Sequence, residues 1–252
     1  MSLVIHPIES KTAWDGFIAA SEPNTFLQSW QWGEFHARTG HAIRRLGIYD
    51  GDVPVGCALV ILIKARRGSF LFCPHGPVLR AGTDAAAAFK ALARSLRELA
   101  QESKCHFIRM STLLLKSDEH ERIFRELGFR SAPIHMHPEL AWILDVAPGE
   151  DALLRGMRKT TRYSIKRAES DGVEIRLSAD PEDVETFWTV YRATVDRQHF
   201  TPFSKDYLRK EFEAFASDGQ AAWFFGSYRG DVISAAMIVF DRHSGYYHQG
   251  AS

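Results

Sequence analysis

Six basic side chains lie within thirteen residues in the second half of the chain, namely Arg155, Arg158, Lys159, Arg162, Lys166 and Arg167. No acidic residue occurs between Asp151 and Glu169. Positions 155, 158, 159, 162 and 166 follow i, i+3, i+4, i+7, i+11 spacing, so a helix over about 151–170 would carry them along one face. Like charges in such a row repel one another unless an anion offsets them, which predicts contact with phosphates. The alternative is a solvated helix face whose charges pair with acids elsewhere.

The residues do not indicate covalent catalysis. No Ser-His-Asp or Cys-His spacing suggests a nucleophile with its base, so the catalytic residues stay unassigned. Cys57, Cys73 and Cys105 are widely spaced and form no CxxC pair, which favours ordinary thiols in a reducing compartment. A His-Met-His run at 135–137 has no Cys or carboxylate cluster near it in sequence. We therefore predict a loop there and no metal site.

The composition is that of a folded protein. Of the 252 residues, 45% are apolar and 25% charged, which excludes disordered, collagen-like and coiled-coil chains. The 31 basic and 31 acidic side chains balance, so no global field attracts the chain to nucleic acid or to an anionic membrane. The longest apolar stretch, residues 53–63, is about half as long as a membrane span. With no secretory signal in residues 1–7, we expect a cytoplasmic protein without a transmembrane segment.

Two hairpins far apart in the sequence suggest an internal duplication. The turns YDGDV at 49–53 and YRGDV at 228–232 each join two strands rich in small and β-branched residues. Each hairpin is followed by a further apolar strand that leads to a glycine, Gly76 in the first copy and Gly250 in the second. We therefore predict two related units, residues 1–147 and residues 148–252.

The two predicted units differ in the elements beyond their shared strands. The first is expected to hold helices over about 11–20 and 30–38, a helix capped by Thr83 or Asp84, a strand over 105–110, a helix ending at Gly128 and a strand over 140–146. The second is expected to hold the basic helix, a strand over 173–177, helices over 181–197 and 204–217, and strands up to Gly250. Because the matching elements after Gly250 are lacking, we expect the second unit to be incomplete and the natural polypeptide to be longer.

The order of elements is that of GNAT-type acyltransferase domains, in which an antiparallel meander is followed by helix, strand and helix. The fold class expected is therefore α/β (α+β), with tandem GNAT-like domains. Members that use CoA bind its pyrophosphate with an Arg/Gln-x-x-Gly-x-Gly/Ala turn at a helix N-terminus. No glycine of this chain fits that turn, since Gly47 and Gly128 are followed by Ile48-Tyr49 and Phe129-Arg130. CoA is accordingly disfavoured as the acyl donor.

Four further motifs succeed one another along the chain: FLQSWQWGEF at 26–35, PHGPV at 74–78, KTTRYSIKRA at 159–168 with Gly172-Val173, and GAS at 250–252. In this order and spacing they resemble the Fem family of peptidoglycan interpeptide-bridge aminoacyltransferases. The resemblance covers the chain from about Thr25 to its last residue. It implies two GNAT-like domains that move an amino acid from aminoacyl-tRNA to an amine on the stem peptide of a cell-wall precursor. It also implies no CoA site, and further sequence after the Gly-Ala-Ser.

The same resemblance implies a precursor site that includes His36, Thr201, Phe203, Tyr207 and Tyr247. The family has a Thr and a Tyr at positions matching Thr201 and Tyr207, but a basic residue where this chain has Phe203. That departure weakens the case for a nucleotide-phosphate contact and points to a lipid-linked precursor. His36 stands where members carry Lys for the precursor diphosphate, and a histidine would serve only when protonated, below about pH 6.5. The alternatives are a helix-capping threonine, a packed tyrosine and a surface histidine.

The sequence thus predicts an aminoacyltransferase that forms peptidoglycan interpeptide bridges. Its partners would be aminoacyl-tRNA and a UDP-linked or lipid-linked precursor, with peripheral membrane proximity and no cofactor. The reaction would be aminolysis of an activated ester, for which positioning supplies most of the rate. Ser111 stands where some members have an acidic residue, so no essential carboxylate is expected there. The alternatives are a GNAT-type N-acyltransferase with another acyl donor, a non-catalytic precursor- or RNA-binding module, and an inactive fragment.

Overall fold

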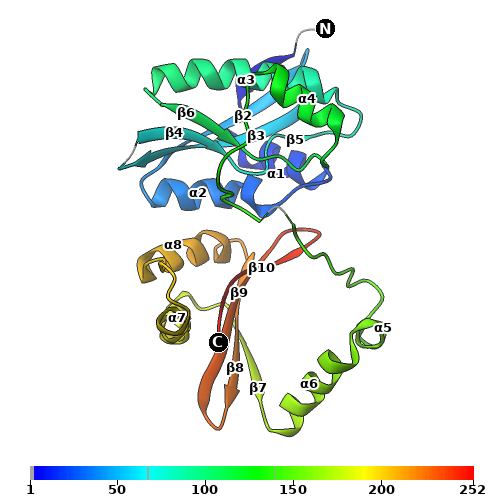
Figure 1. Cartoon of the computed structure of the whole chain (residues 1–252), viewed down its shortest axis with the longest axis vertical. Helices are drawn as coiled ribbons and strands as arrows, with labels where there is room; N and C mark the ends of the chain where they lie inside the picture. Colours follow the sequence, from blue (N-terminus) through cyan, green and yellow to red (C-terminus); the bar gives the residue numbers. More distant parts are fainter. Residues whose placement is uncertain (1–2, 67, 139) are drawn as a thin grey trace. The chain divides into compact units, whose positions relative to one another are not determined.

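The computed structural model describes residues 3–66, 68–138 and 140–252 (Figure 1). The chain forms two compact units, residues 1–134 with 241–244 and residues 135–240 with 245–252. The division follows Ile134, earlier in the sequence than the expected boundary after residue 147. Each unit contains its own sheet, so the architecture is mixed α/β as predicted.

The first unit is built on a sheet whose strands run in the order β1-β2-β3-β4-β6, with β5 paired to β3. The pairs β1–β2, β2–β3 and β3–β4 are antiparallel, whereas β6 is parallel to β4. The strands are β1 (Val4–Pro7), β2 (Ala42–Asp50), β3 (Val53–Ala65), β4 (Gly68–Cys73), β5 (Val78–Leu79) and β6 (Phe107–Met110). The predicted hairpin over 49–61 is therefore the β2–β3 hairpin, with Gly51 at a positive φ of 58° in its turn.

Helices cover both faces of the first sheet (Figure 1). Helices α1 (Lys11–Ala19) and α2 (Trp30–Arg38) lie on one face, while α3 (Ala85–Glu102) lies on the other with α4 (Asp118–Glu126) beside it. Asp84 caps α3, because its side chain accepts a hydrogen bond from the backbone N–H of Ala87 at 3.0 Å. Leu92 and Leu96 of α3 are fully buried in one core cluster with side chains of β2, β3 and β4, which confirms the helical face expected from the sequence.

Gln28 joins three parts of the first unit. It ends the short 3-10 helix Phe26–Gln28, and its side chain is fully buried. The amide Oε1 accepts from the backbone N–H of Leu59 on β3 at 2.8 Å, and Nε2 donates to the carbonyl of Pro74 after β4. Its own carbonyl accepts from the indole N–H of Trp14 on α1 at 2.8 Å. Two of the motifs that resemble the Fem family, at 26–35 and 74–78, thus meet at this residue.

Replacing Gln28 by leucine is expected to lower the free energy of unfolding by about 2–5 kcal/mol. The substitution keeps the side-chain volume close to that of glutamine but leaves a buried N–H of Leu59 and a buried carbonyl of Pro74 without their partner. Urea denaturation followed by circular dichroism measures the effect. The same change at the exposed Gln101 of α3 is the control and should stay within about 0.5 kcal/mol of the wild type. Equal effects of the two substitutions would contradict the stabilising role of the Gln28 hydrogen bonds.

The strand predicted over 140–146 is wrong. Residues 140–146 have no regular secondary structure, and Leu140, Trp142 and Ile143 are 91%, 83% and 87% exposed. A strand forms only where a neighbouring strand satisfies its backbone groups, and none of the described residues pairs with this segment. A run of apolar residues is therefore not enough to predict a strand.

The second unit contains an antiparallel sheet in the order β10-β9-β8-β7. Its strands are β7 (Glu174–Ser178), β8 (Ala221–Tyr228), β9 (Asp231–Phe240) and β10 (Gly245–Ala251). The 3-10 helix Pro181–Asp183 leads into α7 (Val184–Gln198), which is followed by α8 (Lys205–Ala216). The β8–β9–β10 meander matches β2–β3–β4 in order and antiparallel pairing, which confirms the repeat of hairpin and third strand.

Aromatic side chains form the core between the second sheet and its helices. Trp223 of β8 is fully buried, with its ring stacked on Phe212 of α8 at 4.4 Å between centroids. Phe187 of α7 lies on Trp223 at 4.8 Å. Phe215 and Phe225 are buried in the same core. This core fixes α7 and α8, and with them the segment 199–204 that joins them.

Candidate functional site

The basic segment forms two helices rather than the single helix predicted over 151–170. Helix α5 (Glu150–Gly156) ends before Met157 and Arg158, which are extended with ψ of 153° and 148°, and α6 (Lys159–Ser170) then begins. Gly156 is a poor helix former at this break. The guanidinium of Arg162 donates to the carbonyls of Arg155, at 3.2 Å, and of Met157. Arg162 therefore satisfies carbonyl groups at the end of α5 and fixes the joint between the helices.

The other four cations of the predicted set, Arg155, Arg158, Lys159 and Lys166, are exposed, and we call them the α5–α6 basic surface. Within the described parts of the chain no carboxylate forms an ion pair with any of them. Arg167, by contrast, pairs with Asp171 at 3.3 Å. The described residues thus provide no acid partner for these four cations, although a solvated helix face remains an alternative. Contact with phosphates stays a prediction.

The segment 201–207 brings two of the predicted site residues into contact. The rings of Phe203 and Tyr207 stack at 4.4 Å with an interplanar angle of 7°, and Phe203 is 45% exposed. The backbone N–H of Phe203 donates to the hydroxyl of Tyr191 at 3.1 Å. Thr201 is exposed and does not cap α8, because Ser204 accepts the capping hydrogen bond from the N–H of Tyr207 at 3.1 Å. The helix-capping alternative for Thr201 is therefore wrong.

A buried carboxylate adjoins this segment, and sequence reasoning missed it. Glu211 is fully buried, one helical turn after Tyr207, and accepts hydrogen bonds from His248 Nε2 at 2.9 Å and from Gln249 Nε2 at 3.0 Å. Burial, followed by the charges of Glu211 and Tyr191, raises the pKa of the Tyr207 phenol well above its usual range. A signal was present, because Glu211 stands in the apolar i, i+3, i+4, i+7 stripe of α8 that begins at Leu208.

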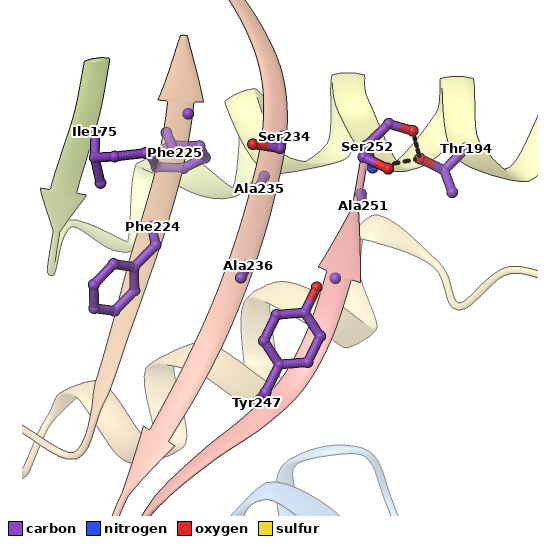
Figure 2. Close-up of a pocket in the computed structure, with 12 residues that line it drawn as sticks. Ile175, Thr194, Phe224, Phe225, Ser234, Ala235, Ala236, Tyr247, Ala251 and Ser252 are labelled. Carbon is purple, nitrogen blue, oxygen red and sulfur yellow. Dashed lines mark hydrogen bonds between the residues drawn. The ribbon is translucent and has the colours of Figure 1, made fainter. Parts of the chain in front are cut away.

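Tyr247, the fourth predicted residue, borders a shallow groove of about 420 Å³ on the second sheet (Figure 2). We call it the β8–β10 groove; its lining includes Ile175, Phe224, Ala236, Tyr247 and Gly250. Tyr247 is 72% exposed, and its ring lies so close over Gly250 that a Cβ there would clash with the phenol. The volume falls in the range of small-molecule clefts.

The end of β10 at the groove is held by α7. The hydroxyl of Thr194 accepts from the N–H of Ser252 and donates to its carbonyl, both at 3.0 Å (Figure 2). Arg197 also donates to that carbonyl. The backbone of the Gly-Ala-Ser motif is thereby fixed against α7.

His36, the fifth predicted residue, belongs to the first unit and is not exposed as a surface histidine would be. It is 9% exposed. The centroid of its ring lies 4.9 Å from that of Trp32, 5.0 Å from that of Phe35 and 5.5 Å from that of His41. The surface alternative is wrong because the helix face that carries His36 turns toward the aromatic core. A diphosphate contact by this residue stays a prediction.

The remaining candidate side chains have structural environments. Cys57 and Cys73 are fully buried, and burial raises the pKa of the Cys73 thiol to about 12 and that of Cys57 well above its usual value. Both are therefore protonated core thiols near neutral pH. Across residues 3–66, 68–138 and 140–252 no three metal-binding side chains come together, and none of the helices there is long and apolar enough to cross a bilayer.

Two protein-family models match the chain, one for each of its two units. The model of the FemAB family matches residues 10–125, and that of an acetyltransferase (GNAT) domain matches residues 155–252. The crystal structure of FemX superposes with a TM-score of 0.83 at 18% identity, covering 98% of this chain and 80% of that one. At this identity the likeness establishes the fold.

Curated relatives include two enzymes named Lipid II:glycine glycyltransferase. The one from Staphylococcus saprophyticus is 23% identical over 221 residues, which are 84% of this chain and 53% of the relative. The one from Staphylococcus aureus is 23% identical over 220 residues, 83% of this chain and 52% of the relative. The chain thus spans about half the length of the curated relatives it matches.

Proposed function

We propose, from the premise that this chain is a Fem-family protein of GNAT-type fold, that it transfers an aminoacyl group to an amine of a lipid-linked peptidoglycan precursor. The observation that carries the proposal is the succession of a FemAB match and a GNAT match along one chain, with relatives named Lipid II:glycine glycyltransferase. Those relatives support a lipid-linked acceptor rather than a nucleotide-linked one. The exposed Phe203, in place of the family's basic residue, is consistent with that choice.

The donor we propose is aminoacyl-tRNA. A charged tRNA presents an activated ester together with many phosphates, and the α5–α6 basic surface offers exposed cations that no acid neutralises among the described residues. The chain has no Arg/Gln-x-x-Gly-x-Gly/Ala turn for the pyrophosphate of CoA, so we propose a reaction without cofactor. Charged tRNA and the headgroup of a lipid-linked precursor meet at the cytoplasmic face of the membrane, where we place the protein.

The chemistry proposed is aminolysis. The neutral acceptor amine attacks the ester carbonyl, the C–N bond forms, and the C–O bond to the ribose breaks as that oxygen takes a proton. Because the ester is reactive, orienting the two substrates accounts for most of the acceleration. We assign Thr201, Phe203, Tyr207 and Tyr247 to the binding of the acceptor, and His36 to a contact with its diphosphate.

A transfer assay tests the proposal directly. The chain is incubated with purified lipid II and a panel of charged tRNAs that includes glycyl-tRNA, and the lipid products are read by mass spectrometry. We expect at least one aminoacyl group to be added to lipid II. The glycyltransferase from Staphylococcus aureus is the positive control. If that enzyme transfers glycine while this chain transfers nothing from any tRNA, the proposed activity is refuted for these 252 residues.

The GNAT match also favours a second candidate, an N-acyltransferase with a different acyl donor. Calorimetric titration with acetyl-CoA distinguishes the two. Saturable binding of acetyl-CoA would support the second candidate, whereas its absence together with transfer from a charged tRNA supports the first.

A further inference from the structure

Glu211 is a fully buried carboxyl group to which the proposed reaction has so far assigned no role. Its side chain is 0% exposed, yet both carboxylate oxygens are occupied: Oε1 by His248 at 2.9 Å and Oε2 by Gln249 at 3.0 Å. An ionised carboxylate is buried at such a site only when hydrogen bonds offset its loss of water. The two side chains that provide them come from consecutive residues of one strand.

A β-bulge makes that arrangement possible. In the β9–β10 ladder Tyr247 pairs with Ile238 and Gln249 pairs with Met237, so His248 is the extra residue between them. Neighbouring side chains of a regular strand point to opposite faces, whereas a bulge re-aims one of them. His248 and Gln249 consequently both reach the carboxylate on α8, while Tyr247 faces the β8–β10 groove.

The contact between Nε2 of His248 and Glu211 favours one tautomer of the imidazole. In the tautomer that donates from Nε2 to the carboxylate, Nδ1 carries the lone pair. The imidazole is 21% exposed, and β10 is an edge strand of the sheet formed by the described residues. A carboxylate that orients an imidazole, which in turn accepts a proton, is a recurrent arrangement for general-base catalysis.

We propose that His248, oriented by the buried Glu211, is the catalytic base of the transfer reaction. The inference rests on the proposed function. It identifies the group that transfers the proton from the attacking amine to the ribose oxygen. As the neutral amine forms the C–N bond, Nδ1 accepts a proton from the attacking nitrogen. The imidazolium, stabilised by Glu211, then returns that proton to the ribose oxygen as the C–O bond breaks. Ester and amine become amide and alcohol, and the enzyme is unchanged.

The surroundings of the pair fit an acceptor-binding role. Tyr207 precedes Glu211 by one helical turn, and the charge of that carboxylate acts on its phenol. Phe203 stacks on Tyr207 and is half-exposed. The base therefore adjoins the segment assigned to the acceptor, across β10 from the groove that Tyr247 borders. Glu211 itself touches no substrate and acts as a positioning residue.

Two conservative variants test the pair. His248→Gln retains an N–H donor for Glu211 but has no base, and we expect kcat for transfer to lipid II to fall about 10²- to 10⁴-fold with little change in KM. Glu211→Gln removes the charge that orients and stabilises the imidazole, and kcat should fall at least about tenfold. Glu213→Gln on the same helix and His6→Gln on the exposed surface of the first unit are matched controls that should keep the wild-type rate.

Chemical rescue distinguishes a catalytic role of His248 from a purely structural one. In His248→Ala, added imidazoles of similar size should restore transfer in proportion to their basicity, since only a base would show that dependence. Rescue independent of basicity, or full activity of His248→Gln in a folded protein, would overturn the proposal while leaving the transfer function intact.

A spectroscopic measurement keeps the inference testable if no transfer is found. Nitrogen-15 spectra of the histidine side chains, assigned by comparison with His248→Gln, should show His248 as the tautomer protonated on Nε2, and Glu211→Gln should perturb that signal. If the wild type shows the opposite tautomer, the proposal that Glu211 orients His248 as a base is refuted, whatever the activity. Absence of transfer by a wild-type protein with the expected tautomer would instead refute the proposed function.

Discussion

Replacing Arg155, Lys159 and Lys166 by glutamine is expected to weaken binding of tRNA about 10- to 100-fold at low salt. These residues are three of the four cations of the α5–α6 basic surface, and no acid pairs with them among the described residues. Each phosphate contact releases counterions and adds about 0.7–0.9 to the slope of log affinity against log salt. The slope should therefore decrease by about 2–3 in the triple variant. Arg162 is left in place, because it fixes the joint between α5 and α6.

Titration of uncharged bulk tRNA at several salt concentrations measures both quantities. The matched control replaces Lys64, Lys90 and Arg94, three exposed cations of the first unit, and so changes the net charge by the same amount. Equal losses in the two triple variants would show that total charge rather than this surface governs binding. An unchanged slope in the first variant would refute the phosphate contacts.

Replacing Trp223 by alanine is expected to lower the free energy of unfolding of the second unit by about 3–5 kcal/mol. The substitution removes a fully buried ring together with its stacking on Phe212 and its tilted contact with Phe187. Domains are stable by only about 5–15 kcal/mol, so the loss is a large part of the total. Segment 199–204 depends on the same core, and proteolysis between α7 and α8 should accelerate accordingly.

Trp223→Phe distinguishes the contribution of the aromatic ring to stability from that of the indole N–H group. The Trp223 indole N–H has no hydrogen-bond partner in the described structure, whereas that of Trp14 donates to the carbonyl of Gln28 at 2.8 Å. Trp223→Phe is therefore expected to cost less than about 1.5 kcal/mol, and Trp14→Phe more, because it also leaves a buried carbonyl unpaired. Urea denaturation followed by circular dichroism measures both. A larger cost for Trp223→Phe than for Trp14→Phe would contradict this account.

Periodicity in the sequence predicted the elements that build the two sheets and their covering helices. The apolar stripe of α3 and the paired glycine turns at Gly51 and Gly230 sufficed, because local spacing dictates which face of a helix is buried and where a hairpin reverses. Segment 140–146 shows the limit of that reasoning. Its run of apolar residues is typical of a buried strand, but pairing depends on a partner strand that local sequence does not specify.

The candidate site residues show the same difference between what sequence predicts and what only the tertiary structure shows. Residue type and spacing alone identified the cations of the α5–α6 basic surface, and the resemblance to a family identified the stacked Phe203 and Tyr207 as candidates. Only the tertiary structure showed that Arg162 closes a helix joint, and that His36 is buried among aromatic rings. These outcomes depend on which atoms surround a side chain, and the surrounding atoms come from distant parts of the chain.

The sequence by itself determined the repeated units, the cationic segment and the resemblance to a family, since all three are carried by local patterns and their order. The tertiary structure decided that Glu211, His248 and Gln249 meet. The physical reason is the β-bulge at His248, which turns two consecutive side chains toward one carboxylate 37 and 38 residues away in sequence. Burial makes that contact necessary, because a buried carboxyl group must be hydrogen-bonded wherever the fold places it.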